Sequence, residues 1–192
     1  MEQIRNTGNS LLLLQLAERM GNAAETRNPQ LVNQPSLNAT ETSAITDVDG
    51  AVLEISTVKD FFKVNSRVTA IEMKPGLCND SQIQRWNVKV YPKLTELVVG
   101  DNCLQFVKGL KLVGFVSLER VAIGMKCMCE SEGCFEVSDC EKLKSVVIGG
   151  GCCMKWSSFV MKNCGVIEVS IGDGCFVSCE KTVFESESSG IR

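Results

Sequence analysis

The 192-residue chain contains no histidine. This excludes zinc sites of the Cys₂His₂ and Cys₃His types, Cys–His nucleophile pairs and Ser–His–Asp triads, because each of them requires an imidazole. No apolar run approaches the roughly 20 residues that cross a membrane. The net charge is −3, with acidic and basic residues interspersed, whereas a nucleic-acid-binding protein typically carries a basic stripe. We therefore expect no membrane span and no nucleic-acid partner.

The chain does contain a regular repeat. Four glycines recur at spacings of 24, 25 and 23 residues, and a cysteine follows each of them three positions later. The glycines are Gly100, Gly124, Gly149 and Gly172, and the cysteines are Cys103, Cys127, Cys152 and Cys175. A fixed period between about 20 and 50 residues is typical of proteins built from stacked repeats.

Each glycine ends a short apolar phrase, as in Leu143, Val146 and Ile148 before Gly149. The last two apolar residues are two apart, which places both side chains on one face of a strand. An earlier copy, residues 68–73, has Lys74 in place of the glycine. We expect each glycine to permit a turn with positive φ.

A second apolar pair recurs with the same period, three times between the glycines, twice before Gly100 and once after Gly172. The pairs are Phe62 with Val64, Trp86 with Val88, Leu110 with Leu112, Phe135 with Val137, Phe159 with Met161, and Val183 with Phe184. Each repeat therefore offers two short strands, and stacking is needed to bury their apolar faces. The pattern predicts a mainly β solenoid of ~24-residue repeats, with about five to six copies between residues 52 and 185.

Two repeats resemble a known family. Leu94, Leu97, Val99, Asn102 and Leu104 fit the leucine-rich-repeat phrase, while Val169, Ile171, Gly172, Asp173, Gly174, Cys175, Phe176 and Cys179 are similar to the bacterial-surface-antigen type (BspA-like) of that repeat. Cysteine replaces the family's usual alanine, and the proline that commonly follows its first strand is missing. The resemblance implies a leucine-rich-repeat-like solenoid, and it implies little about function because such repeats bind many unrelated partners.

The chain divides into three segments. Residues 1–47 form an N-terminal segment, with a short helix expected from about Ser10 to Met20 and a flexible linker rich in Asn, Ser, Thr, Gln and Pro. A cleaved signal peptide is the alternative for the leucine run in that helix. Residues 48–185 are the solenoid, and 186–192 are a polar tail without an obvious capping repeat. Uncapped ends would allow self-association, or the chain is part of a longer repeat array.

The eleven cysteines have a structural explanation. Cys103, Cys127, Cys152 and Cys175 share one repeat position, and Cys140 and Cys164 share another that Phe115 occupies earlier; stacking would place each set in a buried column. We favour reduced thiols in a cytosolic setting over disulfides in a secreted one. No metal or cofactor site is expected. The cysteines expected to be most exposed are Cys129, Cys134, Cys153 and Cys179.

The favoured function is a non-enzymatic protein-interaction scaffold that binds a protein or peptide through a sheet face. The candidate residues are Val98, Ala122 and Val147 on the glycine-ended strands, Lys111 and Glu136 on the second strands, and Trp156 as an exposed anchor in a turn. The alternative for Trp156 is packing against its own repeat, which is commoner for a single tryptophan in a turn. The small apolar side chains at positions 98, 122 and 147 are explained equally well by a segment of the same chain that covers them. The alternatives are a secreted or surface adhesin of the same fold and, more remotely, an enzyme that uses a low-pKa cysteine such as Cys129 or Cys153.

Overall fold

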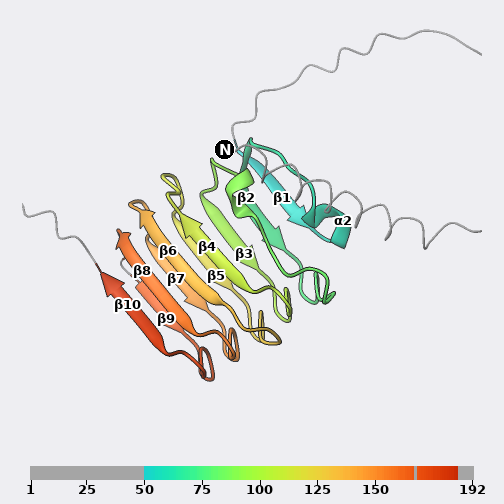
Figure 1. The fold of residues 1–192 in the computed structure, drawn as a ribbon. Coiled ribbons are helices and arrows are strands. Elements are labelled where there is room, and N and C mark those ends of the chain that lie inside the picture. The colour runs from blue at the N-terminus through green and yellow to red at the C-terminus, as the bar shows by residue number, and fades with distance from the viewer. Residues whose placement is uncertain (1–49, 167, 186–192) are drawn as a thin grey trace, which may run out of the picture. The chain divides into compact units, whose positions relative to one another are not determined.

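A computed structural model describes residues 50–166 and 168–185. The described chain winds through about five turns of a mainly β solenoid with a spacing of about 24 residues, which confirms the predicted fold class (Figure 1). The expected helix at Ser10–Met20, the linker and the tail at 186–192 lie outside the described residues.

Two parallel sheets form the walls of the solenoid. The six-stranded sheet has the order β1 (Ala51–Ile55), β2 (Val68–Met73), β3 (Glu96–Val99), β5 (Arg120–Ile123), β7 (Ser145–Ile148) and β9 (Glu168–Ile171). The four-stranded sheet has the order β10 (Lys181–Glu185), β8 (Ser158–Cys164), β6 (Cys134–Cys140) and β4 (Gly109–Val113). From β3 onward, each turn of the chain contributes one strand to each sheet, as the paired apolar phrases predicted.

The core lies between the two sheets and is built from equivalent positions of successive repeats. In the six-stranded sheet, Val99, Ile123 and Ile148 stack in register and are all buried. In the four-stranded sheet, Phe135 and Phe159 lie in register, with their rings stacked at a centroid distance of 5.2 Å. Side chains alternate between core and surface along each strand, so the register sets which residues face outward.

The repeated glycines are required by close packing and not by backbone conformation. Gly100, Gly124, Gly149 and Gly172 do not have positive φ, which contradicts the expectation from the sequence. Each backbone N–H instead donates to a carbonyl of the preceding repeat, as Gly149 does to Ile123 at 2.8 Å. A Cβ atom at these positions would lie only 2.4–2.7 Å from the nearest heavy atom of the preceding turn, which is too close for any side chain.

Most of the positive φ values fall two and four positions after these glycines and after Lys74, which holds their position in the earlier repeat. The first of these positions is held by Gly76, Asn102, Lys126, Gly151 and Gly174, and the second by Cys78, Leu104, Met128, Cys153 and Phe176. Most of these residues are not glycine, although the left-handed region is costly for other residues. The backbone hydrogen bonds between successive turns hold them there, as Met128 N–H to the Cys103 carbonyl does at 3.2 Å.

The first two repeats lack the expected second strand. The Phe62–Val64 pair follows a short helix, α2 (Val58–Phe61), and Val88 begins a 3₁₀-helix, η1 (Val88–Val90). These two predictions are wrong because local hydrogen bonds compete with strand formation. The side chain of Asn87 accepts from the backbone N–H of Lys89, which turns the chain after Trp86.

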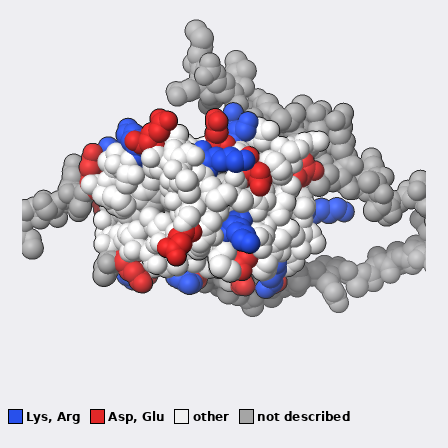
Figure 2. Space-filling model, turned by 90° about the horizontal axis from the view of Figure 1, so that it is seen from below, with Lys and Arg blue, Asp and Glu red and all other residues white. Residues whose placement is uncertain are grey.

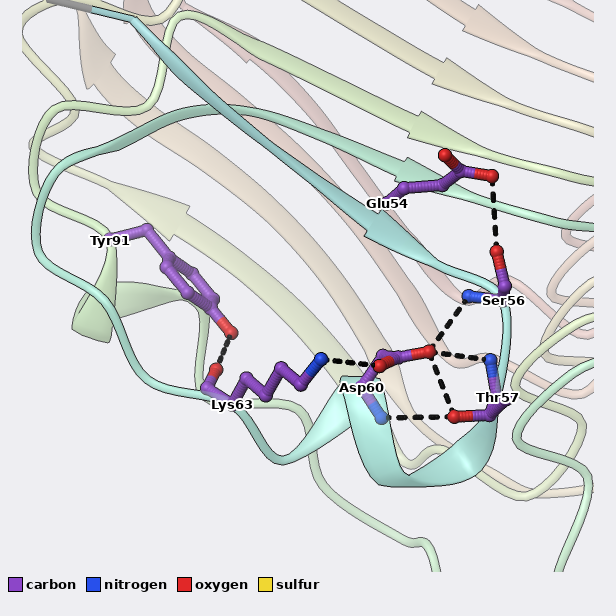
Figure 3. A network of polar contacts seen from close by, with 6 residues as sticks. All are labelled: Glu54, Ser56, Thr57, Asp60, Lys63 and Tyr91. Carbon is purple, nitrogen blue, oxygen red and sulfur yellow. Dashed lines mark hydrogen bonds and ion pairs between the residues drawn. The ribbon is translucent and has the colours of Figure 1, made fainter. Parts of the chain in front are cut away.

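A capping box begins α2. The Thr57 hydroxyl accepts from the Asp60 backbone N–H at 3.4 Å, and the Asp60 carboxylate accepts from the Thr57 N–H at 2.8 Å (Figure 3). Lys63 forms an ion pair with Asp60 at 2.7 Å, and the Tyr91 hydroxyl donates to the Lys63 carbonyl at 2.6 Å. This network ties α2 to the next turn of the chain. The Thr-x-x-Asp pattern is a recognised helix-start signal, so the sequence did contain the information.

Candidate functional site

The outer face of the six-stranded sheet carries a column of small apolar side chains. Val98, Ala122 and Val147 are direct neighbours in the parallel register of β3, β5 and β7. Each is half-buried, although each points away from the core. On either side of these three strands, the same column continues as Glu72 in β2 and Ser170 in β9. The structure thus brings together the three sheet-face residues that the sequence singled out.

Ion pairs border this column. Arg120 contacts Glu96 across β3 and β5, and Lys144 contacts Glu119 at 2.6 Å. Near the N-terminal strands, Lys74 lies 3.2 Å from Glu54 and 3.4 Å from Glu72. These bonds hold the pKa of Glu54 below its ordinary value and raise that of Lys74. The column is therefore an apolar strip bordered by charges of both signs.

The surface carries charges of both signs elsewhere too. Figure 2 shows the face seen from below, where acidic and basic side chains are interspersed over a mostly uncharged surface. Such a mixture suits contacts with protein or peptide, since neither sign dominates.

Lys111 and Glu136 lie on a different surface from the apolar column. They are neighbours in β4 and β6, and their side chains form an ion pair at 3.2 Å on the outer face of the four-stranded sheet. The ion pair raises the pKa of Lys111. Because the shared core separates the two sheets, these two residues do not form a single site with Val98, Ala122 and Val147.

Trp156 belongs to the core. Its side chain is 0% exposed, so the prediction of an exposed anchor is wrong. Gly133 makes room for the indole, since a Cβ there would lie 2.8 Å from Trp156 Nε1. Among the described residues this indole nitrogen has no hydrogen-bond partner. The structure instead agrees with the alternative, a packed turn tryptophan, because the turns of this solenoid have an inner side.

The cysteine column forms a hydrogen-bonded ladder along the turns. The Sγ atoms of Cys127 and Cys152 donate to the carbonyls of Gly100 and Gly124 at 3.1 and 2.9 Å. The backbone N–H of Cys127 in turn donates to the sulfur of Cys152 at 3.3 Å. Cys103 and Cys175 make the equivalent thiol-to-carbonyl bonds. A thiol therefore fills this position because it is small and can pair with polar backbone groups at the turn.

The second predicted column is also present. Cys140 and Cys164 are register neighbours in β6 and β8. Cys140 is buried and Cys164 half-buried. All eleven cysteines are free in the structure.

The two cysteines considered as nucleophiles lie in different surroundings. Cys153 is fully buried, which contradicts the expectation of exposure, and burial raises the pKa of its thiol well above the ordinary range. Cys129 is half-buried, and burial raises its pKa as well. A reactive cysteine needs a lowered pKa and solvent access, so neither residue has the surroundings of a nucleophile. Cys134 and Cys179 are half-buried.

No group of three or more possible metal ligands occurs among residues 50–166 and 168–185. Within the same part of the chain, no helix is both long and apolar enough to cross a membrane. Comparisons with protein-family models, curated proteins and solved structures gave no match.

Proposed function

We propose that this chain is a non-enzymatic interaction scaffold that binds a protein or peptide through the outer face of its six-stranded sheet. The observation that carries the proposal is the half-buried apolar column of Val98, Ala122 and Val147, aligned across three central strands. No cofactor enters the proposal, and the cytosol is the proposed setting.

Two features of this face support a protein or peptide ligand. Its central side chains are small, so a partner can approach the strands closely and bury apolar surface against them. The bordering ion pairs, Arg120 with Glu96 and Lys144 with Glu119, supply charges of both signs at the rim. An apolar centre with a polar rim is the usual composition of a protein interface.

The resemblance of the turns to BspA-like leucine-rich repeats is consistent with this proposal, because solenoids present extended sheet surfaces for binding. The family assignment itself is part of the proposal. It predicts that the binding residues vary between repeats while the glycine and apolar positions recur.

A photo-crosslinking experiment tests the binding face. A photoreactive amino acid replaces Ala122 in the full chain, which is then irradiated in an extract of the source cells. We expect a discrete crosslinked protein that an excess of unlabelled wild-type chain displaces. An excess of the Val98→Glu/Val147→Glu variant should not displace it, because two carboxylates in the apolar centre oppose burial.

The matched control uses the other sheet. Exchanging the ion pair, as Lys111→Glu/Glu136→Lys, keeps the net charge and should leave a chain that competes as well as the wild type. Equal competition by the Val98→Glu/Val147→Glu variant, with its fold intact by circular dichroism, would place binding elsewhere and refute the proposal. The absence of any displaceable crosslink from position 122 would also refute it.

A further inference from the structure

The two ends of the repeat stack differ in how they are closed. At the N-terminal end, α2 packs against β1, and the inward-facing Ile55 is buried. In the four-stranded sheet, η1 lies beside β4, and the inner side chains Leu110 and Leu112 are also buried. The first turns therefore cover the apolar interior at this end.

The C-terminal end is open in the described part of the chain. Val169 and Ile171 continue the inner columns of Val146 and Ile148, yet each is 40% exposed. Phe184, the register neighbour of Met161, is 57% exposed. Apolar side chains that belong to the inner columns but remain exposed to solvent favour a partner that covers them.

The backbone at this end also has free edges. The backbone N–H of Glu168 donates to the carbonyl of Lys144, the residue before β7, at 3.0 Å. The N–H of Gly172 donates to the carbonyl of Ile148 in β7 at 2.8 Å. Because successive amides in a strand point to opposite sides, those of Val169 and Ile171 point to the open edge. In β10, the backbone N–H of Lys181 donates to the carbonyl of Ser157, the residue before β8, at 3.1 Å. By the same alternation, the amides of Thr182 and Phe184 point to the open edge.

We propose that a second copy of this chain covers the C-terminal end, with β9 and β10 each pairing antiparallel with the same strand of the other copy across a twofold axis. This interface is separate from the proposed binding face, because it uses strand edges and the end of the core. A head-to-tail stack would instead place the exposed inner side chains of β9 and β10 against the N-terminal end, where the inward-facing Ile55 is already buried beside α2.

The sequence of β10 is complementary to itself in this arrangement. An antiparallel register centred on Val183 places Lys181 of one copy opposite Glu185 of the other, twice per dimer. The same register pairs Thr182 with Phe184, the two residues whose amides point to the open edge. Each copy therefore offers hydrogen-bonding groups where the other needs them, and the charges alternate in sign. In β9, a register centred on Ser170 pairs Val169 with Ile171 and sets no like charges opposite one another.

Charge reversal at the two ends of β10 gives a test on the full chain under reducing conditions. We expect the wild type to dimerise in sedimentation equilibrium. Lys181→Glu and Glu185→Lys should each weaken the dimer roughly tenfold or more, since opposite charges across two strands become like charges at two symmetric positions. Lys111→Glu, a reversal on β4 at the opposite edge of the four-stranded sheet, is the matched control and should not change dimerisation.

Mixing the two variants provides a signature specific to the twofold arrangement. In a mixed dimer, the two acidic side chains of the first variant face the two lysines of the second, so both pairs are restored. We expect heterodimers to form at wild-type affinity although neither variant dimerises well alone. A dimerisation affinity that these substitutions leave unchanged would overturn the proposed pairing. So would a mixture of the two variants that dimerises no more tightly than either variant alone.

Hydrogen exchange distinguishes other occupants of this end. The amides of Val169, Ile171, Thr182 and Phe184 should exchange slowly in the dimer and quickly after dilution to monomer. If they remain protected in a strictly monomeric wild type, another segment of the same chain covers the edges, and the proposal is wrong. A wild type that stays monomeric at every concentration overturns it equally.

Discussion

A Cβ atom on Gly149 would lie 2.7 Å from the carbonyl carbon of Gly124, the glycine one repeat earlier in the chain. Backbone cannot withdraw as a flexible side chain can, so Gly149→Ala must push two turns apart and lengthen the 2.8 Å bond from its N–H to Ile123. We expect a loss of roughly 3 kcal/mol or more in the free energy of unfolding, measured by urea denaturation.

Gly114→Ala is the matched control for that substitution. Gly114 has a φ of 74°, and a Cβ there would meet no heavy atom within 4 Å. The cost should therefore come from the left-handed backbone alone, about 1–2 kcal/mol. Equal losses for the two variants would show that conformation, and not close packing, requires glycine at position 149.

Lys126→Gly should stabilise the protein. Lys126 has a φ of 54°, while glycine occupies the equivalent positions at Gly76, Gly151 and Gly174. Removing the side chain relieves the left-handed strain, and the greater freedom of glycine in the unfolded chain offsets part of the gain. We expect a net increase of about 0.5–1 kcal/mol in the free energy of unfolding. A decrease would mean that contacts of the lysine side chain outweigh the strain.

The repeat and its inward-facing strands could be predicted from the sequence because periodic apolar residues directly reflect burial. Ile123, Ile148 and their equivalents are examples. The role of the glycines could not be predicted, since glycine is typical both of positive φ and of close backbone approach. Only the distances between turns distinguish the two. The burial of Trp156 was not determined by the sequence for a related reason, because no periodicity indicates which side of a turn faces the core.

The candidate binding face was predictable only in part. Val98, Ala122 and Val147 align because strand alternation and the repeat length together determine their positions. Lys111 and Glu136 lie on the second strands as expected, but the repeat pattern does not show that these strands form a separate sheet with its own outer face. The contrast between the two ends depends on α2, whose capping box is a local signal that the repeat pattern does not contain.

Ile148→Asp tests the strand register. Ile148 is buried in the continuous core, whereas its neighbour Val147 lies on the outer face. An aspartate at position 148 buries an unpaired charge and should prevent cooperative folding. Val147→Asp should remain folded, as judged by circular dichroism and thermal melting. A stable, monomeric Ile148→Asp variant would contradict the register.

Acid should weaken the network around α2. The ion pair with Lys63 and the bonds from Thr57 hold the pKa of Asp60 below its ordinary value of 3.8. A carboxylate whose pKa is lowered by folding stabilises the folded state above its ordinary pKa, and this contribution is lost as the pH falls through the lowered value. Asp60→Asn should therefore reduce the melting temperature at neutral pH, with the difference from wild type shrinking below about pH 4. A difference that does not depend on pH would show that the charge is unimportant.

Counting thiols tests the compartment and the cysteine ladder together. Without reductant, we expect all eleven thiols to react with a chromogenic disulfide reagent after denaturation, as a cytosolic scaffold requires. In the native protein, half-buried thiols such as those of Cys134 and Cys179 should react first. Cys153 should not react, because it is fully buried and its pKa is raised, and Cys78 should behave similarly because burial raises its pKa to about 12.

The denatured count separates the two settings of the same fold. A count well below eleven would mean that cysteines are paired, which favours the secreted or surface adhesin over the cytosolic scaffold. Rapid reaction of Cys103, Cys127 or Cys152 in the native protein would instead contradict the ladder, because each of these sulfurs is buried and bonded to a carbonyl of the preceding repeat. Compartment and packing are thus tested by different parts of one titration, so one can fail while the other stands.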